Sequence, residues 1–179
     1  IHFNQFFLVK SLGYNLWKGN NELSQVEGYE NLSKTEFTEL NFKISNIEKN
    51  KYYEINRDDI FLNQAIKNLN EDSFHYIQLF FKKFVSYYFI DINSSYPNYY
   101  NFIHIIPIFL LSILSFPGLF IFCKSKKFEN KILSLYLFFS MAIFSIFFIL
   151  PRYKLAILPI QIILAASFVT YLMRRYGTK

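Results

Sequence analysis

Long apolar stretches in the second half of the chain predict helices that cross a membrane. They run from Phe102 to Cys123, from Ile132 to Leu150 and from Leu155 to Met173. A membrane-spanning helix needs about 20 apolar residues at a rise of about 1.5 Å each. Helices in soluble cores rarely stay apolar on every face over such a length. We therefore expect three transmembrane helices, at 102–123, 132–150 and 155–173.

The first 101 residues are polar and mixed, and their pattern predicts two helices and some strand. Asn56 fits the N-cap of a helix that ends near Leu69. Asp58 and Asp59 then fall in its first turn, where the helix dipole favours carboxylates. A catalytic carboxylate pair is the alternative interpretation. Phe3–Val9 and Phe37–Ile44 are read as short strands.

A second helix is predicted near residues 72–89, with one apolar and one polar face. The apolar face carries Phe74, Ile77, Phe81, Phe84, Val85 and Tyr88, and the polar face carries His75, Gln78, Lys82 and Ser86. Lys82 and Lys83 lie in its middle, which argues against a membrane span. A basic, aromatic, amphipathic helix favours a position in the membrane interface, so we expect this helix to rest on the bilayer.

Charge divides the chain at the same boundary and sets its orientation. Residues 1–101 hold 10 Lys and Arg against 12 Asp and Glu, whereas 102–179 hold nine basic residues and only Glu129. The loop 124–131 and the C-terminus are the more basic side, which indicates that they are cytoplasmic. Residues 1–101 then lie outside the cytoplasm. The excess positive charge belongs to the membrane half and does not indicate a nucleic-acid partner.

These patterns predict a mainly α membrane protein with an N-terminal extracytoplasmic segment of α and minor β structure. An extracytoplasmic segment must be translocated, and the chain opens on Ile1 with no signal peptide of the usual form. We expect the chain to be the C-terminal piece of a larger multi-helix bundle.

Few side chains point to catalysis. The single cysteine, Cys123, allows neither an internal disulfide nor a cysteine metal site. The histidines, His2, His75 and His104, are scattered, and no phosphate-binding glycine loop occurs. His104, at the mouth of the first span, is either an interfacial histidine or a functional one. We predict no metal and no cofactor, and name no catalytic residue in this part.

Arg152 is the most suggestive cation. It stands in PRYK, a short turn between two predicted spans on the outer side. A guanidinium offers a rigid fork to two phosphate oxygens, and Lys154 would assist it. The alternative is that both side chains only reach lipid headgroups.

The segment GYNLWKGNN, Gly13–Asn21, combines the only tryptophan with two glycines and three asparagines. One interpretation is a structured turn in which Gly13 and Gly19 adopt positive φ and Trp17 is an anchor. The other is a rigid loop, lining a cavity, whose Asn20 and Asn21 amides bind a polar ligand such as a sugar.

The order of several motifs resembles a known family. GYNLWKGNN is followed by RDDIFLNQAIKNL, FFKKF, YPNYYN before the first span, and PRYKLAILP before the last. This series is similar to the C-terminal part of bacterial membrane glycosyltransferases of family 39. They are C-type enzymes related to protein O-mannosyltransferases and aminoarabinose transferases.

The resemblance implies transfer of a sugar from a polyprenyl-phosphate carrier to a glycan, lipid or protein acceptor on the outer face of the bacterial inner membrane. It implies that Arg152 lies near the donor phosphate. Gly19, Asn20 and Asn21 would form a turn over the active-site cavity. The general base of such enzymes is typically an Asp in the first outer loop, a part not present here. The rival interpretations are a non-catalytic membrane protein with an outer binding domain, and a flippase or ligase of lipid-linked oligosaccharides.

Overall fold

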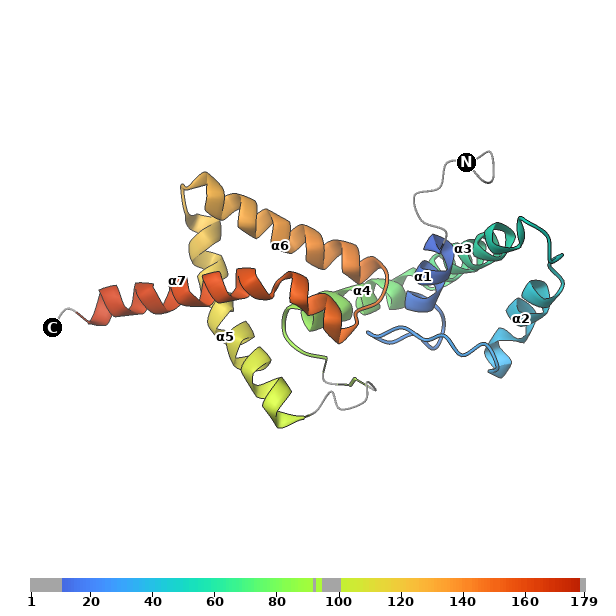
Figure 1. Ribbon diagram of the computed structural model, residues 1–179, viewed down its shortest axis with the longest axis horizontal. Coiled ribbons are helices and arrows are strands. Elements are labelled where there is room, and N and C mark those ends of the chain that lie inside the picture. The colour runs from blue at the N-terminus through green and yellow to red at the C-terminus, as the bar shows by residue number, and fades with distance from the viewer. Residues whose placement is uncertain (1–10, 92, 95–100, 178–179) are drawn as a thin grey trace. The chain divides into compact units, whose positions relative to one another are not determined.

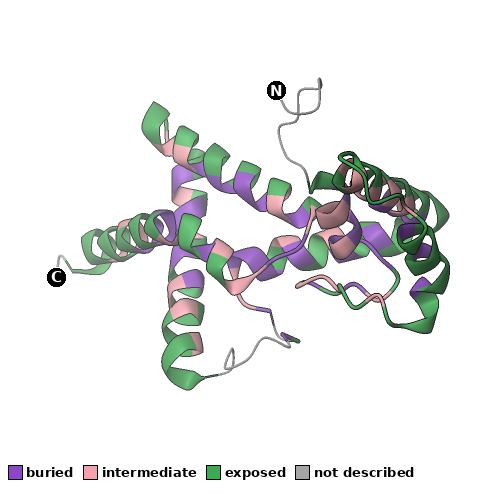
Figure 2. Ribbon diagram, turned by 45° about the vertical axis from the view of Figure 1, so that its right-hand side comes forward, coloured by how far each residue is buried: buried purple, intermediate pink, exposed green. Residues whose placement is uncertain are grey.

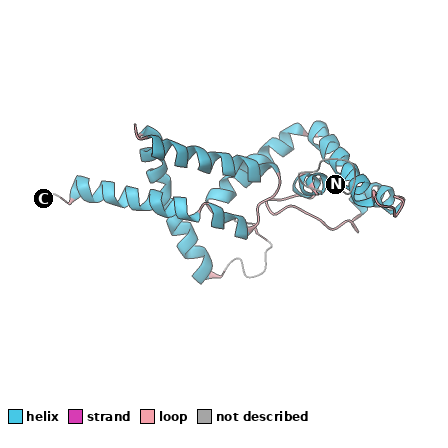
Figure 3. Ribbon diagram, turned by 45° about the horizontal axis from the view of Figure 1, so that its top comes forward, coloured by secondary structure: helices cyan, strands magenta, loops and turns pink. Residues whose placement is uncertain are grey.

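The computed structural model describes residues 11–91, 93–94 and 101–177, and it is mainly helical (Figures 1 and 3). In chain order the elements are α1 (Leu12–Gly19), the 3-10 helix η1 (Thr35–Phe37), α2 (Thr38–Ser45), α3 (Tyr53–Glu71), α4 (Ser73–Tyr88), α5 (Phe102–Lys124), α6 (Phe128–Ile146), the 3-10 helix η2 (Pro151–Ala156) and α7 (Leu158–Tyr176). The described ranges contain no strand. Two compact units form, one from residues 1–81 with 146–148 and one from 82–145 with 149–179.

The first unit is built around the indole of Trp17. This side chain is fully buried, with ring centroids 4.9 Å from Phe61 of α3 and 5.3 Å from Phe37 of η1. Leu40 and Ile44 of α2 complete the same core. Figure 2 shows the buried faces of these helices turned inward. Large aromatic side chains supply most of the apolar burial in so small a unit.

Several expectations for this unit are corrected. Residues 37–44 are helical, not a strand, and the proposed strand at 3–9 lies outside the described residues. Helix α3 begins at Tyr53, before the expected Asn56. Asp58 and Asp59 therefore lie beyond the first turn of α3 and do not start that helix.

The predicted second helix is present as α4, and one of its faces is buried. Tyr76, Leu79 and Lys83 lie on the buried face, whereas Lys82 is exposed. The two lysines therefore differ, and the expectation that both rest on a bilayer is wrong for Lys83. Tyr88, expected on the outer apolar face, is buried too.

In the second unit, α5 and α6 are each long and apolar enough to cross a membrane. The third predicted span, 155–173, lies largely in helix α7, which starts at Leu158 and has Arg174 and Arg175 in its last turn. Helix α7 is not among the described helices that are long and apolar enough to cross a membrane, so a third span stays a prediction. Helix α5 crosses α7 (Figures 1 and 3). Gly118 permits this crossing, because a Cβ there would lie 2.0 Å from the carbonyl oxygen of Leu164.

Candidate functional site

The turn that carries Arg152 is the short helix η2. Pro151 occupies its first turn, where the fixed φ of proline suits a helix start. The Tyr153 amide donates to the Leu150 carbonyl at 2.9 Å, and the Ile157 amide to the Lys154 carbonyl at 3.0 Å. Arg152 is exposed, with its guanidinium carbon 5.6 Å from the centre of the Tyr153 ring. A stacked guanidinium keeps its outward N–H groups available to an anion.

Lys154, two residues later, is 5% exposed and donates to the carbonyl oxygen of Phe89, just beyond α4. A cation suits this end of a helix, where carbonyl oxygens are left without helical partners. Burial lowers the pKa of Lys154 to about 7, although the charge of Asp91 acts to raise it. The ammonium of Lys154 was expected to be a second phosphate ligand. In the structure it has a structural role, because it binds the carbonyl oxygen of Phe89.

Two further side chains hold the end of α4. The Tyr88 carbonyl accepts from the side-chain amide of Gln161 (α7) and from the hydroxyl of Ser112 (α5), both at 2.9 Å. The Tyr88 hydroxyl and the Ser115 hydroxyl lie 2.8 Å apart. We call Ser112, Lys154 and Gln161 the carbonyl clamp. The sequence did offer a signal for it, because Ser112 and Gln161 are polar residues within predicted apolar spans.

Aromatic stacking also holds η2. The ring of Phe144 stacks with those of Tyr87 and Tyr153, with centroid distances of 5.2 and 5.0 Å. The Tyr87 hydroxyl also donates to the Tyr153 carbonyl at 3.2 Å. Arg152 therefore lies on a turn in which the next two residues, Tyr153 and Lys154, are both held in place.

A small, largely apolar pocket adjoins this turn. Its lining residues are Ile90, His104, Ile105, Ile108, Pro151 and Lys154. His104, on the first turn of α5, is exposed. The pocket thus combines isoleucine side chains with the Lys154 ammonium and the His104 imidazole. Its lining residue Pro151 directly precedes Arg152 in sequence. The pocket's volume of about 10 Å³ is close to that of one water molecule, so the pocket itself does not hold a larger ligand.

The GYNLWKGNN segment is not the expected turn, because Leu12–Gly19 is helix α1. Gly13 and Gly19 are required by close approach: a Cβ would lie 2.1 Å from the Asp58 carbonyl oxygen at Gly13 and 1.9 Å from that of Phe147 at Gly19. Within the described residues, the glycine with positive φ is Gly28, at 75°.

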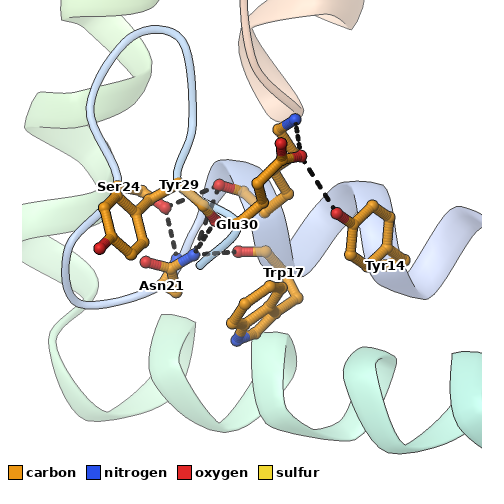
Figure 4. Close-up of polar contacts among 7 residues, drawn as sticks. Tyr14, Trp17, Asn21, Ser24, Tyr29 and Glu30 are labelled. Atoms are coloured by element: carbon orange, nitrogen blue, oxygen red, sulfur yellow. Dashed lines mark hydrogen bonds and ion pairs between the residues drawn. The ribbon is translucent and has the colours of Figure 1, made fainter. Parts of the chain in front are cut away.

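The two asparagine amides bind backbone groups, and Figure 4 shows those of Asn21. Asn20 donates to the carbonyls of Leu16 and Ile146 at 2.9 and 2.8 Å. Asn21 is fully buried, donates to the Tyr29 carbonyl at 2.8 Å and accepts from the Leu23 amide at 3.1 Å. These bonds favour the structural interpretation over sugar binding. The Asn20 bond joins the end of α1 to Ile146, which precedes η2 in sequence.

A second pocket, of about 280 Å³, lies in the first unit and is lined by Ser11, Tyr14, Glu54, Arg57, Asp58 and Phe61. Asp58 accepts from the backbone amides of Gly13 and Tyr14 at 3.0 and 2.8 Å. It therefore satisfies the N-terminus of α1, which favours the structural interpretation over a catalytic pair with Asp59. The Arg57 Nε is buried without a hydrogen-bond partner among the described residues.

Metal chemistry and homology give no further assignment. Within the parts of the chain that the structure describes, no group of His, Cys, Asp or Glu side chains could hold a metal ion. No family model, no curated protein and no solved structure matches the chain.

Proposed function

We propose that this chain is the C-terminal part of a membrane glycosyltransferase. It would transfer a sugar from a polyprenyl-phosphate carrier to an acceptor on the outer face of a bacterial inner membrane. The observation that carries the proposal is the exposed guanidinium of Arg152 on the fixed turn η2, beside an apolar pocket. Helices α5 and α6, which could cross a membrane, support the membrane location.

A polyprenyl-phosphate head and its first isoprene units match this site chemically. The Arg152 fork can bind two phosphate oxygens, and the exposed His104 lines the pocket beside this turn. Ile105 and Ile108 lie beside this turn and would offer an apolar surface to the carrier. In this arrangement the phosphate stays at the membrane surface, while the polyprenyl tail of the carrier runs along α5.

The reaction requires charge stabilisation on the carrier phosphate. The acceptor oxygen bonds to the anomeric carbon, and the bond from that carbon to the phosphate oxygen breaks. The polyprenyl phosphate leaves with the bonding electrons, so negative charge grows on the phosphate beside Arg152. A fixed donor aimed at developing charge lowers the barrier. The acceptor proton passes to a base that we place outside residues 1–179, in line with the family resemblance.

The orientation follows from the loop charges. Residues 1–101, η2 and its pocket face the periplasm, and the lysine-rich loop 124–131 faces the cytoplasm. The α4 helix, which precedes α5 in sequence, lies on the outer side of the membrane. A membrane-bound acceptor approaching from that side would meet η2.

The test is sugar transfer by the full-length protein in membranes, with a radiolabelled polyprenyl-phosphate sugar as donor. Arg152→Ala should lower transfer by about 10²–10³-fold, and Arg152→Lys should recover only part of it. Arg175→Ala, which removes an exposed cation from the far end of α7, is the matched control. All three variants should accumulate normally. Full transfer by Arg152→Ala, or no transfer by the wild type from any such donor, would refute the proposal.

A further inference from the structure

The pocket of about 280 Å³ lies wholly within the first unit, where α1 lies against α3 (Figure 1). The two helices are fixed against each other at this point. The Asp58 carboxylate of α3 accepts from the backbone amides of Gly13 and Tyr14, and a Cβ at Gly13 would lie 2.1 Å from the Asp58 carbonyl oxygen. A pocket between fixed helices is already formed before a ligand arrives, which reduces the entropic cost of binding.

Arg57 contributes a donor without an acceptor to this pocket. Its Nε is buried and, in the part of the chain that the structure describes, has no hydrogen-bond partner. Its guanidinium carbon lies 5.5 Å from the centre of the fully buried Phe61 ring. Glu54 and Asp58 line the same pocket, yet the ion pairs among the described residues do not include Arg57. A buried N–H group without an acceptor costs free energy, so the pocket favours a molecule that brings an acceptor to Arg57.

The same pocket also offers acceptors, so its polar groups are of both kinds. Glu54 is exposed, and the Asp58 oxygens keep lone pairs beyond those that bind the two amides. The Ser11 hydroxyl accepts from the Asn15 side-chain amide at 3.2 Å and has its own proton to donate. The two carboxylates would repel an anion at Arg57, and Arg57 would repel a cation at the carboxylates. Neighbouring hydroxyl groups match this pocket, because each hydroxyl both donates and accepts.

Tyr14 gives the pocket an apolar wall. Its ring is partly exposed and stands edge-on to Phe61 at a centroid distance of 5.1 Å, and its hydroxyl donates to Glu30 at 3.2 Å. These contacts hold an aromatic surface beside the polar groups. A sugar ring has the complementary surfaces, since its C–H groups can pack on an aromatic ring while its hydroxyls bind polar side chains. Because small-molecule sites begin at about 300 Å³, a pocket of this size suits a single sugar ring.

We infer that this pocket binds one neutral sugar unit. The sugar hydroxyls accept from Arg57 and donate to Glu54 and Asp58, and the C–H groups of the ring pack on Tyr14. The inference goes beyond the proposed glycosyltransferase function and uses neither Arg152 nor the transfer reaction, so it can fail while that proposal stands. An amino acid, whose two charged groups could also pair with this pocket, is the alternative that the experiment excludes.

The experiment is saturation-transfer NMR on the full-length protein in a detergent that has no sugar headgroup. The sugar probes are the methyl glycosides of glucose, mannose, galactose and N-acetylglucosamine, and the charged probes are inorganic phosphate and phenylalanine. Arg57→Met removes the donor, and Glu54→Gln removes one carboxylate. Lys67→Met, which changes an exposed cation on α3, is the matched control. Arg152→Ala separates this pocket from the turn η2, and thermal unfolding followed by circular dichroism checks that each variant is folded.

We expect at least one methyl glycoside to bind the wild type saturably. Arg57→Met should weaken this binding by about tenfold and Glu54→Gln by about fivefold, the sizes expected for single hydrogen bonds to charged side chains. Lys67→Met and Arg152→Ala should bind as the wild type does.

Three results would overturn the inference. The first is that none of the methyl glycosides binds saturably, or that only phosphate or phenylalanine binds. The second is equal binding by Arg57→Met and the wild type. The third is binding that Arg152→Ala loses and Arg57→Met keeps, which would place the sugar at η2. If Arg57→Met does not fold, Glu54→Gln decides, and unchanged binding by that variant overturns the inference.

Discussion

Asp58 should stabilise the first unit much more than its neighbour Asp59. The Asp58 carboxylate accepts from the backbone amides of Gly13 and Tyr14 at the start of α1, whereas Asp59 is exposed. In Asp58→Ala, both amides lose their acceptor at a partly buried helix end. Asp59→Ala leaves the contacts of α1 unchanged. Comparing the two variants therefore separates the capping role of Asp58 from a general effect of removing one negative charge on stability.

The expected cost follows from the two bonds. Loss of an N-terminal capping side chain costs about 0.5–2 kcal/mol, and this one makes two bonds with a charged acceptor, which favours the upper half of that range. We expect Asp58→Ala to lower the free energy of unfolding by about 1.5 kcal/mol. With a urea m-value of about 1.5 kcal/mol/M, the midpoint falls by about 1 M. Asp59→Ala should stay within about 0.5 kcal/mol of the wild type.

Trp17 provides the assay, since it is the only tryptophan in this chain and is fully buried in the core that α1 contributes to. Its emission should shift to longer wavelength when urea exposes the indole, and can be followed with the protein in detergent micelles. Equal midpoints for Asp58→Ala and Asp59→Ala would refute the capping role. A loss of activity without loss of stability in Asp58→Ala would instead favour the carboxylate-pair interpretation.

Three further predictions address other contacts. Gly19→Ala should destabilise the first unit by about 1–3 kcal/mol, because the Cβ of the new alanine would lie 1.9 Å from the Phe147 carbonyl oxygen. The control Asn15→Ala, on the same helix, should lower the free energy of unfolding by less than about 1 kcal/mol in the same urea titration. Asn21→Ala should cost about 2–3 kcal/mol, since it leaves the Tyr29 carbonyl and the Leu23 amide without the Asn21 side chain; a change below 0.5 kcal/mol, on the surface-substitution scale, would contradict this. Burial lowers the pKa values of Lys154 and Lys83 to about 7 from 10.5. Between these pH values the unfolded chain binds more protons than the folded chain, so the free energy of unfolding rises with pH across that window. Lys154→Met should reduce this rise, measured by thermal unfolding followed by circular dichroism, and an unchanged rise would contradict the burial of a charged Lys154.

The sequence predicts the helices well where apolar residues repeat at a regular local spacing. It predicts them less well where contacts with distant segments determine the local structure. The α4 helix follows its 3.6-residue pattern and was predicted to within about a residue at each end. Residues 37–44 were read as a strand, although Phe37, Leu40 and Ile44 are spaced three and four residues apart, which is the pattern of a helix. Here the error lay in the choice of period.

The role of the glycines and asparagines could not be read from local sequence. Gly13 and Gly19 looked like turn residues because glycine is common in turns, but each is required by a backbone far away in sequence. Gly13 meets Asp58, and Gly19 meets Phe147. In the same way, the burial of Lys83 was missed because an amphipathic pattern assigns a face to a lysine but does not show which other segments cover that face.

The polar residues inside the apolar stretches connect these findings. Ser112 and Gln161 are costly in a hydrocarbon environment unless they are paired, and both donate to the same carbonyl, that of Tyr88. Lys154 of η2 donates to the next carbonyl, that of Phe89. The end of α4 and the turn that carries Arg152 are therefore held through one set of bonds. A change that releases α4 should also loosen η2, so that Gln161→Leu would weaken any anion bound at Arg152 although Gln161 does not reach it. Full retention of donor binding in Gln161→Leu would show that the two are independent.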